Sequence, residues 1–294
     1  MKPTLPVTVL IAVRNEEANL PRCLAALDRA QRVLVVDSNS TDDSAKIAAA
    51  AGAEVVNYEH PGGLRKKRQW ALDTLEFQTP WVLLLDADEV VPDALWDEIE
   101  QALEESTTHD GFLITKEFHF MGKRFRWGGF SHAAVLLIRV GKARFETLVE
   151  VPGDTLDMEV HERVQVNGSI GTLATPVIHE DFKGLEAYID RHNRYSTWDA
   201  HLRLHFLETG THGSDAVRPR LLGNVQERRR WLKSLAVRTP IEPWLWFFYH
   251  YILRLGFLHG RAGLIAAQIR RQYIINARAK LYELRLGGTQ NDQP

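Results

Sequence analysis

Four segments of strand length alternate with helix-like segments in the first 104 residues, and this alternation constrains the fold more than any other feature. Apolar runs span residues 5–13, 32–37 and 81–86, and a third short strand is expected at residues 53–58. Continuous apolar runs of this length are typical of strands that are buried on both faces of a parallel sheet. Helical spacing or helix-start signals mark residues 18–29, 43–51, 64–76 and 93–104. The pattern predicts an α/β fold with a doubly wound, mostly parallel, Rossmann-like sheet and helices on both faces.

The second half of the chain has a different character. Further strands are expected at residues 112–120, 134–140 and 160–166, and long helices at 185–207, 219–237 and 260–286. We expect a domain over residues 1–208, followed by a basic, aromatic-rich helical extension over 209–294.

Composition excludes several classes of protein. Hydrophobic residues make up 45% of the 294 and charged residues 25%, which is ordinary for a soluble globular protein and excludes a disordered or collagen-like chain. Cys23 is the only cysteine, so neither an internal disulfide nor a cysteine zinc cluster can form. No apolar stretch of a secretory signal follows Met1, and we expect a cytoplasmic location.

Charge divides the chain unevenly. Residues 1–182 hold 18 basic and 29 acidic side chains, whereas residues 183–294 hold 18 and 9. Residues 218–238 are rich in arginine, and an aromatic stretch follows at 243–258 that is shorter than the roughly 20 residues needed to span a bilayer. A basic helix beside aromatic residues indicates peripheral contact with an anionic membrane surface. The alternative is a helix buried against the sheet. No nucleic-acid-binding motif is present, so no nucleic acid is expected as a partner.

Polar residues follow three of the predicted strands, where a parallel sheet binds its ligands. They are Arg14-Asn15-Glu16, Asp37-Ser38 and Asp86-Ala87-Asp88. Two carboxylates at a strand end can bind Mg²⁺ or Mn²⁺, and the bound cation would neutralise the charge of a diphosphate leaving group. The structural alternatives are that Asp88 and Glu89 only begin a loop and that Asp37 caps the loop 38–41. The basic run 65–68 follows Gly62-Gly63 and could hold phosphate at a helix N-terminus, or form a solvated face.

Together, segments 7–20, 33–44 and 81–89 resemble the start of a family 2 glycosyltransferase of the GT-A fold. The most similar branch is the lipopolysaccharide core glycosyltransferases of the WaaE type. That branch shares the basic stretch before Gln69-Trp70-Ala71-Leu72, the segment 160–164 and the segment 193–197. The resemblance covers residues 5–200 well and the last third loosely.

The resemblance implies a role for each matching residue. The nucleotide-binding residues would be Ala12, Val13, Arg14, Glu16, Asp37, Arg68, Asp86 and Ala87, and the metal ligands Asp88 and His179. Glu162 would be the catalytic base, with Glu159 and Asp157 as competitors and a structural ion pair to Arg163 or Arg139 as the alternative. Two positions depart from the usual pattern: Ser38 follows Asp37 where a second aspartate is common, and Arg14 replaces a frequent tyrosine.

The resemblance also implies the reaction. It is an inverting, metal-dependent transfer of a sugar from a nucleotide-diphosphate donor, expected to be a UDP-sugar, to a glycan or lipid-linked acceptor such as lipopolysaccharide core. Two other classes of function stay open at this point. They are a sugar-phosphate nucleotidyltransferase, although no glycine-rich loop follows the first strand, and a non-catalytic nucleic-acid- or lipid-binding module.

Overall fold

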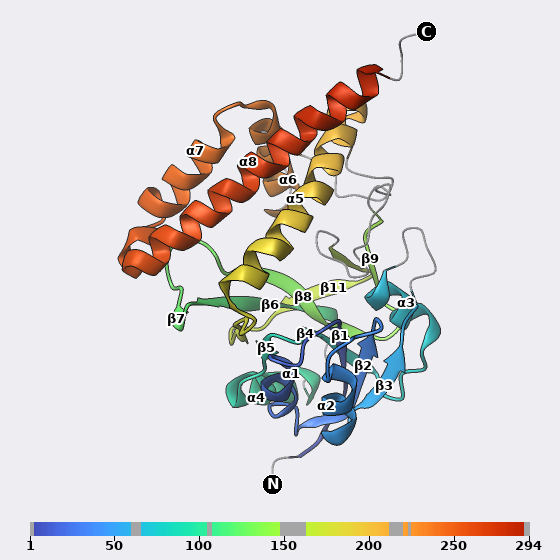
Figure 1. The fold of residues 1–294 in the computed structure, drawn as a ribbon. Coiled ribbons are helices and arrows are strands. Elements are labelled where there is room, and N and C mark those ends of the chain that lie inside the picture. Colours follow the sequence, from blue (N-terminus) through green and yellow to red (C-terminus); the bar gives the residue numbers. More distant parts are fainter. Residues whose placement is uncertain are drawn as a thin grey trace. The chain divides into compact units, whose positions relative to one another are not determined.

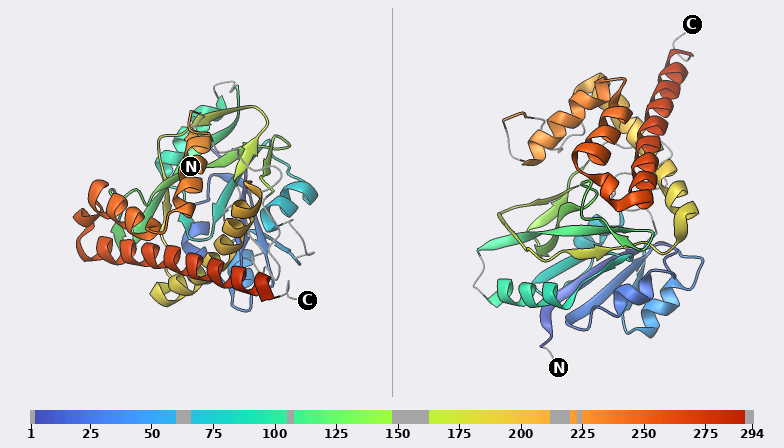
Figure 2. Two further views of the ribbon diagram at one scale, coloured as in Figure 1. Left: turned by 90° about the horizontal axis from the view of Figure 1, so that it is seen from above. Right: turned by 90° about the vertical axis from the view of Figure 1, so that its left-hand side faces the viewer.

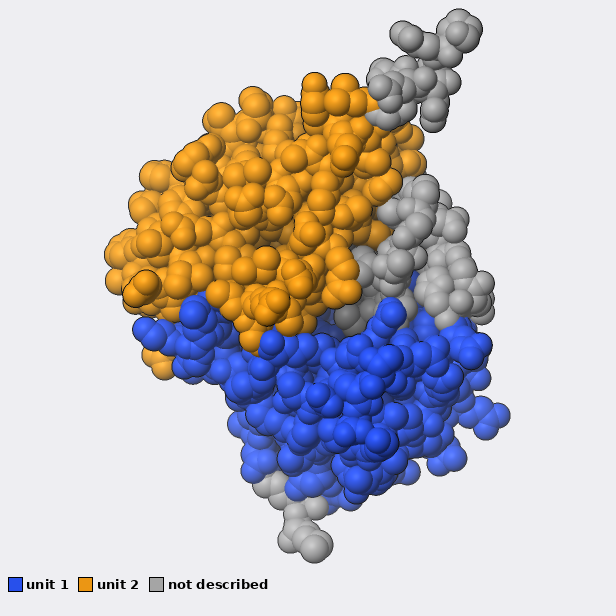
Figure 3. All heavy atoms as spheres, viewed as in Figure 1, with its two compact units in different colours: residues 1–124, 130–146, 156–183 blue, residues 125–129, 147–155, 184–294 orange. Residues whose placement is uncertain are grey.

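The structure is a computed structural model that describes residues 3–59, 66–104, 108–147, 163–211, 220–222 and 225–290. The chain divides into two compact units, coloured separately in Figure 3. Unit 1 comprises residues 1–124, 130–146 and 156–183, and unit 2 comprises residues 125–129, 147–155 and 184–294.

Unit 1 is built on a ten-stranded sheet with the order β3-β2-β1-β4-β8-β6-β12-β5, and β7 and β11 pair with β6 (Figure 1). Its strands are β1 (Leu5–Val13), β2 (Ala30–Asp37), β3 (Glu54–Asn57), β4 (Trp81–Asp86), β5 (Glu89–Val90), β6 (His109–Phe120), β7 (Lys123–Arg124), β8 (His132–Arg139), β11 (Ser169–Thr172) and β12 (Val177–His179). A separate two-stranded sheet joins β9 (Ala143–Phe145) to β10 (Val164–Val166).

Parallel pairing joins the first four strands, and β8 then runs antiparallel between β4 and β6. The predicted mostly parallel sheet is therefore confirmed, with strands 5–13 and 81–86 at the predicted bounds.

Helices of unit 1 cover both faces of this sheet. They are α1 (Leu20–Leu24), α2 (Ser44–Ala50), α3 (Lys67–Thr74) and α4 (Asp93–Glu104). Alternate side chains of β1 enter two different cores: Val9 and Ile11 pack with Trp96 of α4, whereas Leu10 packs with Ala71 of α3. Burial on both faces is the reason why the first strand is an unbroken apolar run.

Unit 2 is helical. Its elements are α5 (Gly184–Thr209), α6 (Val225–Arg238), α7 (Glu242–Phe247), a π-helix η1 (Phe248–Leu253), a 3₁₀-helix η2 (Gly256–His259) and α8 (Gly260–Gln290). In Figure 2 the red α8 runs beside the yellow α5. Lys280 of α8 donates hydrogen bonds to the Asn193 carbonyl oxygen (2.7 Å) and the Ser196 hydroxyl (2.9 Å) of α5. Within the described residues, no helix combines the length and apolar composition needed to cross a bilayer.

This packing places α5 with the C-terminal helices, so the compact units divide at Gly184. A buried ion cluster strengthens the same association, because Arg203 of α5 bonds both Asp199 (2.8 Å) and Glu242 of α7 (2.7 Å). The functional division into residues 1–208 and 209–294 stays a prediction.

Gly263 provides a test of the packing within unit 2. A methyl group at this helical position would lie 2.3 Å from the Gly256 carbonyl oxygen. Alanine normally favours a helix over glycine by about 1 kcal/mol, but here we expect Gly263→Ala to destabilise the helices by about 1–3 kcal/mol through overpacking. Chemical denaturation followed by circular dichroism measures this change. Gln268→Ala, at an exposed position of the same helix, should be nearly neutral, and a Gly263→Ala protein of raised stability would contradict the close approach.

Candidate active site

The register of the sheet brings the predicted strand ends together. Val13 of β1 pairs with Asp37 of β2, and Ala12 of β1 pairs with Asp86 of β4. The two aspartates therefore flank the end of the first strand, at the edge where parallel sheets bind ligands. Ala12, Val13 and Ala87 are buried there.

The turn after β1 is held against the loop after β2 by hydrogen bonds. The Asn15 and Glu16 amides donate to the hydroxyls of Ser40 (2.9 Å) and Ser44 (2.8 Å), and the Thr41 amide donates to Asn15 Oδ1 (2.8 Å). Asn15 has a φ of +54°, a left-handed conformation that asparagine tolerates better than most residues. The sequence Arg14-Asn15-Glu16 thus builds a fixed turn.

Asp37 and Glu16 have partners within the protein. The buried Asp37 carboxylate accepts hydrogen bonds from the Ser40 amide (3.0 Å) and the Ser40 hydroxyl, so it caps the following loop as the structural alternative expected. Glu16 pairs with Lys183 at 2.5 Å, yet burial outweighs this pairing and raises the pKa of Glu16. Arg14 is exposed at the same turn.

The basic stretch at the start of α3 is buried rather than solvated. Lys66, Lys67 and Arg68 are each at most 8% exposed. Lys67 Nζ donates to the Val13 carbonyl oxygen (2.6 Å), and Arg68 donates to the Leu85 carbonyl oxygen (3.1 Å) and to the Asp86 carboxylate. Lys67 and Arg68 therefore each bind the end of a neighbouring strand, and positive charge is held beside the acidic strand ends.

Lys116 of β6 joins two carboxylates at this edge. Its ammonium lies 2.7 Å from Asp86 Oδ2 and 2.6 Å from Glu89 Oε1. Burial favours a raised pKa for Asp86, but Arg68 and Lys116 together outweigh it and hold the pKa well below its usual range. Lys116 likewise overcomes the effect of burial and lowers the pKa of Glu89. Both acids are therefore ionised at neutral pH.

His179 completes the cluster. Its Nδ1 atom lies 3.4 Å from Asp88 Oδ1 and 3.5 Å from Glu89 Oε1, and within the described part of the chain this buried atom makes no hydrogen bond. Burial lowers the pKa of His179, but Asp88 and Glu89 reverse this effect and raise it to about 9.

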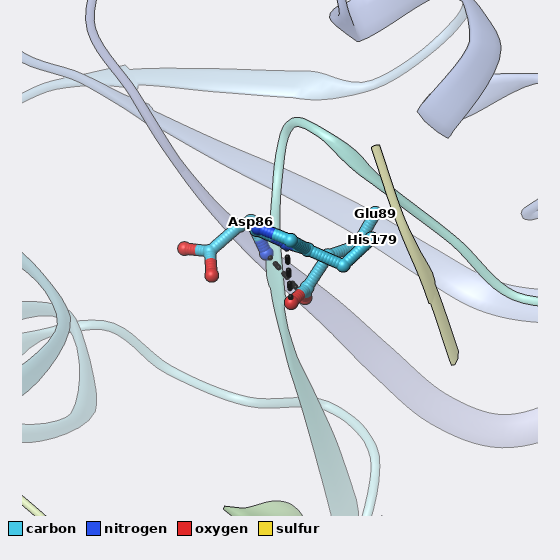
Figure 4. A group of neighbouring side chains, drawn as sticks. All are labelled: Asp86, Glu89 and His179. Carbon is cyan, nitrogen blue, oxygen red and sulfur yellow. Dashed lines mark hydrogen bonds and ion pairs between the residues drawn. The ribbon is translucent and has the colours of Figure 1, made fainter. Parts of the chain in front are cut away.

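One oxygen each of Asp86 and Glu89 and a His179 ring nitrogen lie within 4.8 Å of one another, close enough to hold a metal ion. In Figure 4 the His179 ring faces the Glu89 carboxylate, whereas the Asp86 carboxylate points the other way, consistent with its pairing to Arg68 and Lys116. This group includes His179 but not Asp88, the other predicted metal ligand, whose Oδ1 atom lies 3.4 Å from His179 Nδ1.

Sequence reasoning missed Glu89 and Lys116 as members of the site. Glu89 belongs to the short strand β5, whose partner His179 is 90 positions away in the chain, so no local pattern indicates it. The sequence does indicate Lys116, because this lysine closely follows the apolar segment Phe112–Ile114 within an expected strand, and a buried lysine requires acidic partners. Glu162, the predicted base, lies outside the described residues, as do its competitors Glu159 and Asp157.

Comparison with known proteins identifies the family. The model of glycosyl transferase family 2 matches residues 8–148, which include most of β1 and every strand end described above except His179 of β12. Residues 8–148 therefore form a glycosyltransferase family 2 domain. This glycosyltransferase is 28% identical over 96% of its length to the lipopolysaccharide core biosynthesis glycosyltransferase LpsC of Rhizobium meliloti, 94% of which is covered.

Two further proteins resemble parts or all of this glycosyltransferase. An uncharacterized glycosyltransferase of Mycobacterium bovis is 45% identical over 82 residues, which are 28% of this chain and 36% of that protein. The mannosyltransferase PcManGT of Pyrobaculum calidifontis, solved in complex with GDP-Man and Mn²⁺, has a TM-score of 0.52 at 16% identity, with 95% of this chain and 87% of that one covered. The latter likeness shows the shared fold.

Proposed function

We propose that this glycosyltransferase inverts the configuration at the anomeric carbon of the sugar it transfers and depends on Mg²⁺ or Mn²⁺. The sugar would come from a nucleotide-diphosphate donor, a UDP-sugar. The observation that carries the proposal is the cluster of Asp86, Asp88, Glu89, Lys116 and His179 at the strand ends. This cluster lies where an α/β sheet binds nucleotides, and it combines carboxylate and imidazole ligands with buried cations.

The side chains that are present suit a divalent cation at Asp88 and His179. Lys116 already neutralises Asp86 and Glu89, so these carboxylates have a positive partner within the protein. His179 Nδ1 lies 3.4 Å from Asp88 Oδ1, so an imidazole nitrogen and a carboxylate oxygen are close enough to bind one ion. When bound, the cation would neutralise negative charge on the diphosphate leaving group.

The remaining roles belong to the protein's own side chains. Arg68 and Lys116 hold Asp86 in place, so that this carboxylate is ready to contact the ribose of the donor, and Asp37 keeps the loop after β2 in position. Glu162 would remove the proton from the acceptor hydroxyl as its oxygen attacks the anomeric carbon, which is the role that a carboxylate takes in direct displacement.

Support for the acceptor class comes from the relative LpsC. LpsC acts in lipopolysaccharide core biosynthesis by its name, and the similarity extends over 96% of this chain. We therefore propose a glycan or lipid-linked acceptor such as lipopolysaccharide core. PcManGT holds GDP-Man with Mn²⁺ on the same fold, which supports a metal-assisted nucleotide site.

A thermal-shift titration with nucleoside diphosphates tests the donor and the metal together. We expect UDP to raise the melting temperature in Mn²⁺ but not in chelator, since a ligand at a hundred times its dissociation constant stabilises the folded state by about 2.7 kcal/mol. GDP, ADP and CDP serve as matched controls for the base. Failure of every nucleoside diphosphate to bind with metal would contradict the proposal, and release of pyrophosphate in turnover would indicate a nucleotidyltransferase instead.

A further inference from the structure

Six large apolar side chains of unit 2 form one exposed stripe, which we call the interfacial patch. They are Trp244, Leu245, Phe248, Tyr249, Ile252 and Leu253, and each is between 40% and 60% exposed. They occur as adjacent pairs every four residues through α7 and η1, so they follow one face of the helix. The intervening side chains are turned inward, because Glu242 and Pro243 are buried and Trp246 and Phe247 are half-buried.

The patch is continued and held in shape by its neighbours. Phe257 and Leu258 of η2 are 42% and 54% exposed, so the apolar surface extends past the end of η1. The turn is braced by residues 125–129, since the Gly128 amide donates to the Arg254 carbonyl oxygen (2.7 Å) and His250 Nδ1 donates to the Gly128 carbonyl oxygen (2.5 Å). A contiguous exposed apolar surface of this kind is typical of an interaction site.

The segment that carries the interfacial patch has only basic charged side chains from residue 243 to residue 282. Residues 243–282 contain no aspartate or glutamate, and Glu242 is buried in its pairing with Arg203. The Arg271 guanidinium stacks over Trp244 at 3.5 Å from the ring centroid, and that of Arg254 lies 6.0 Å from the Tyr249 ring. Arginines are thus held at the rim of an aromatic surface. In a bilayer interface, such arginines would contact the lipid headgroups while the aromatic side chains contact the apolar layer beneath them.

We propose that the interfacial patch docks this glycosyltransferase on the surface of an anionic lipid bilayer. Aromatic and leucine side chains enter the boundary between headgroups and acyl chains, while the arginines contact lipid phosphates. A second copy of the chain is a poorer occupant because it would bring the same arginines against themselves. A nucleic acid would match the charge but leave the leucines in water.

Vesicle flotation tests this docking without relying on enzymatic activity. The full chain should float with vesicles of phosphatidylcholine containing about 30% phosphatidylglycerol, and bind pure phosphatidylcholine far less. Raising the salt from about 0.1 M to about 1 M should weaken binding, because the Debye length falls from ~10 to ~3 Å. Leu245→Ser with Leu253→Ser should reduce binding about tenfold or more, because both leucine side chains move from water into the bilayer interface when the unaltered chain binds.

Matched controls separate the patch from exposed apolar residues in general. Tyr282→Ser with Leu286→Ser changes two exposed side chains of α8 and should bind vesicles as the unaltered chain does. Should the patch variant fail to fold, brominated lipids supply a second measurement: they should quench the tryptophan fluorescence of the unaltered chain, and Trp244→Phe should lose most of that quenching. Absence of flotation or unchanged flotation of the patch variant would overturn the proposal. So would the finding that the unaltered chain is a dimer and the patch variant a monomer.

Discussion

Replacing Lys116 by methionine is expected to lower the free energy of unfolding by about 3–5 kcal/mol, the usual cost of removing one partner from a buried ion pair. The ammonium neutralises Glu89, whose side chain is fully buried, and shares Asp86 with Arg68. Without it, Glu89 is a buried carboxylate that lacks its cation. Denaturation in urea at neutral pH measures the loss.

Two comparisons show whether that loss comes from the ion pairs. Lys142→Met, at an exposed position, should change stability by less than about 0.5 kcal/mol. Adding Glu89→Gln to Lys116→Met should restore part of the lost stability, because it removes the carboxylate left without its cation. A Lys116→Met protein as stable as the unaltered chain would show that the ammonium does not compensate Asp86 and Glu89.

The pH dependence of this difference has a definite sign. The folded-state pKa values of Asp86 and Glu89 are lowered, so their pairing stabilises the fold above the unfolded-state values near about 4 and is lost as the pH falls below them. In Lys116→Met, burial instead favours the protonated acid. The stability gap between the two proteins should therefore be largest at neutral pH and shrink in acid.

Local sequence pattern was sufficient for the parallel part of the sheet. Strands such as β1 and β4 are buried on both faces, and such burial requires consecutive apolar residues, so the apolar runs in the sequence match the observed bounds. The long helices α5 and α8 were predicted for a similar reason. In contrast, the two-residue strand β5 and the three-residue strand β12 exist only because they pair with each other and with β6, and such pairing leaves no periodic signal.

The same distinction applies to the site. Asp86 ends strand β4 and Asp88 follows it closely, so their place at the sheet edge could be predicted from the chain alone. Arg68 and His179 were named only through the family resemblance and Lys116 was missed, because these three partners reach the edge from three separate elements. The burial of Lys66–Arg68 is another tertiary effect, since a run of cations in sequence usually lies on a solvated face.

Asp88→Asn and Glu162→Gln are expected to abolish sugar transfer in distinguishable ways. Asp88→Asn removes a charged oxygen that faces His179 at 3.4 Å, so the Mn²⁺-dependent thermal shift by UDP should disappear. Turnover should fall about a thousandfold, because the charge stabilisation that a metal supplies amounts to several kcal/mol and each 1.36 kcal/mol is tenfold in rate. Glu162→Gln should keep the Mn²⁺-dependent thermal shift by UDP. Its turnover should fall by about 10²–10⁴-fold, because glutamine cannot accept the proton of the acceptor hydroxyl.

The contrast between these variants assigns the roles more sharply than either loss alone. Asp110→Asn is the matched control, because Asp110 pairs with Arg139 at 3.2 Å and should keep normal turnover. Retention of the Mn²⁺-dependent shift in Asp88→Asn would indicate that the metal binds Asp86, Glu89 and His179 instead. The Lys116 ammonium would then have to leave its ion pairs with these carboxylates. Near-normal turnover of Glu162→Gln would leave the base to Glu159 or Asp157. Binding of donor and removal of the proton would then be separate functions of separate carboxylates, one fixed by the sheet edge and one supplied from elsewhere in the chain.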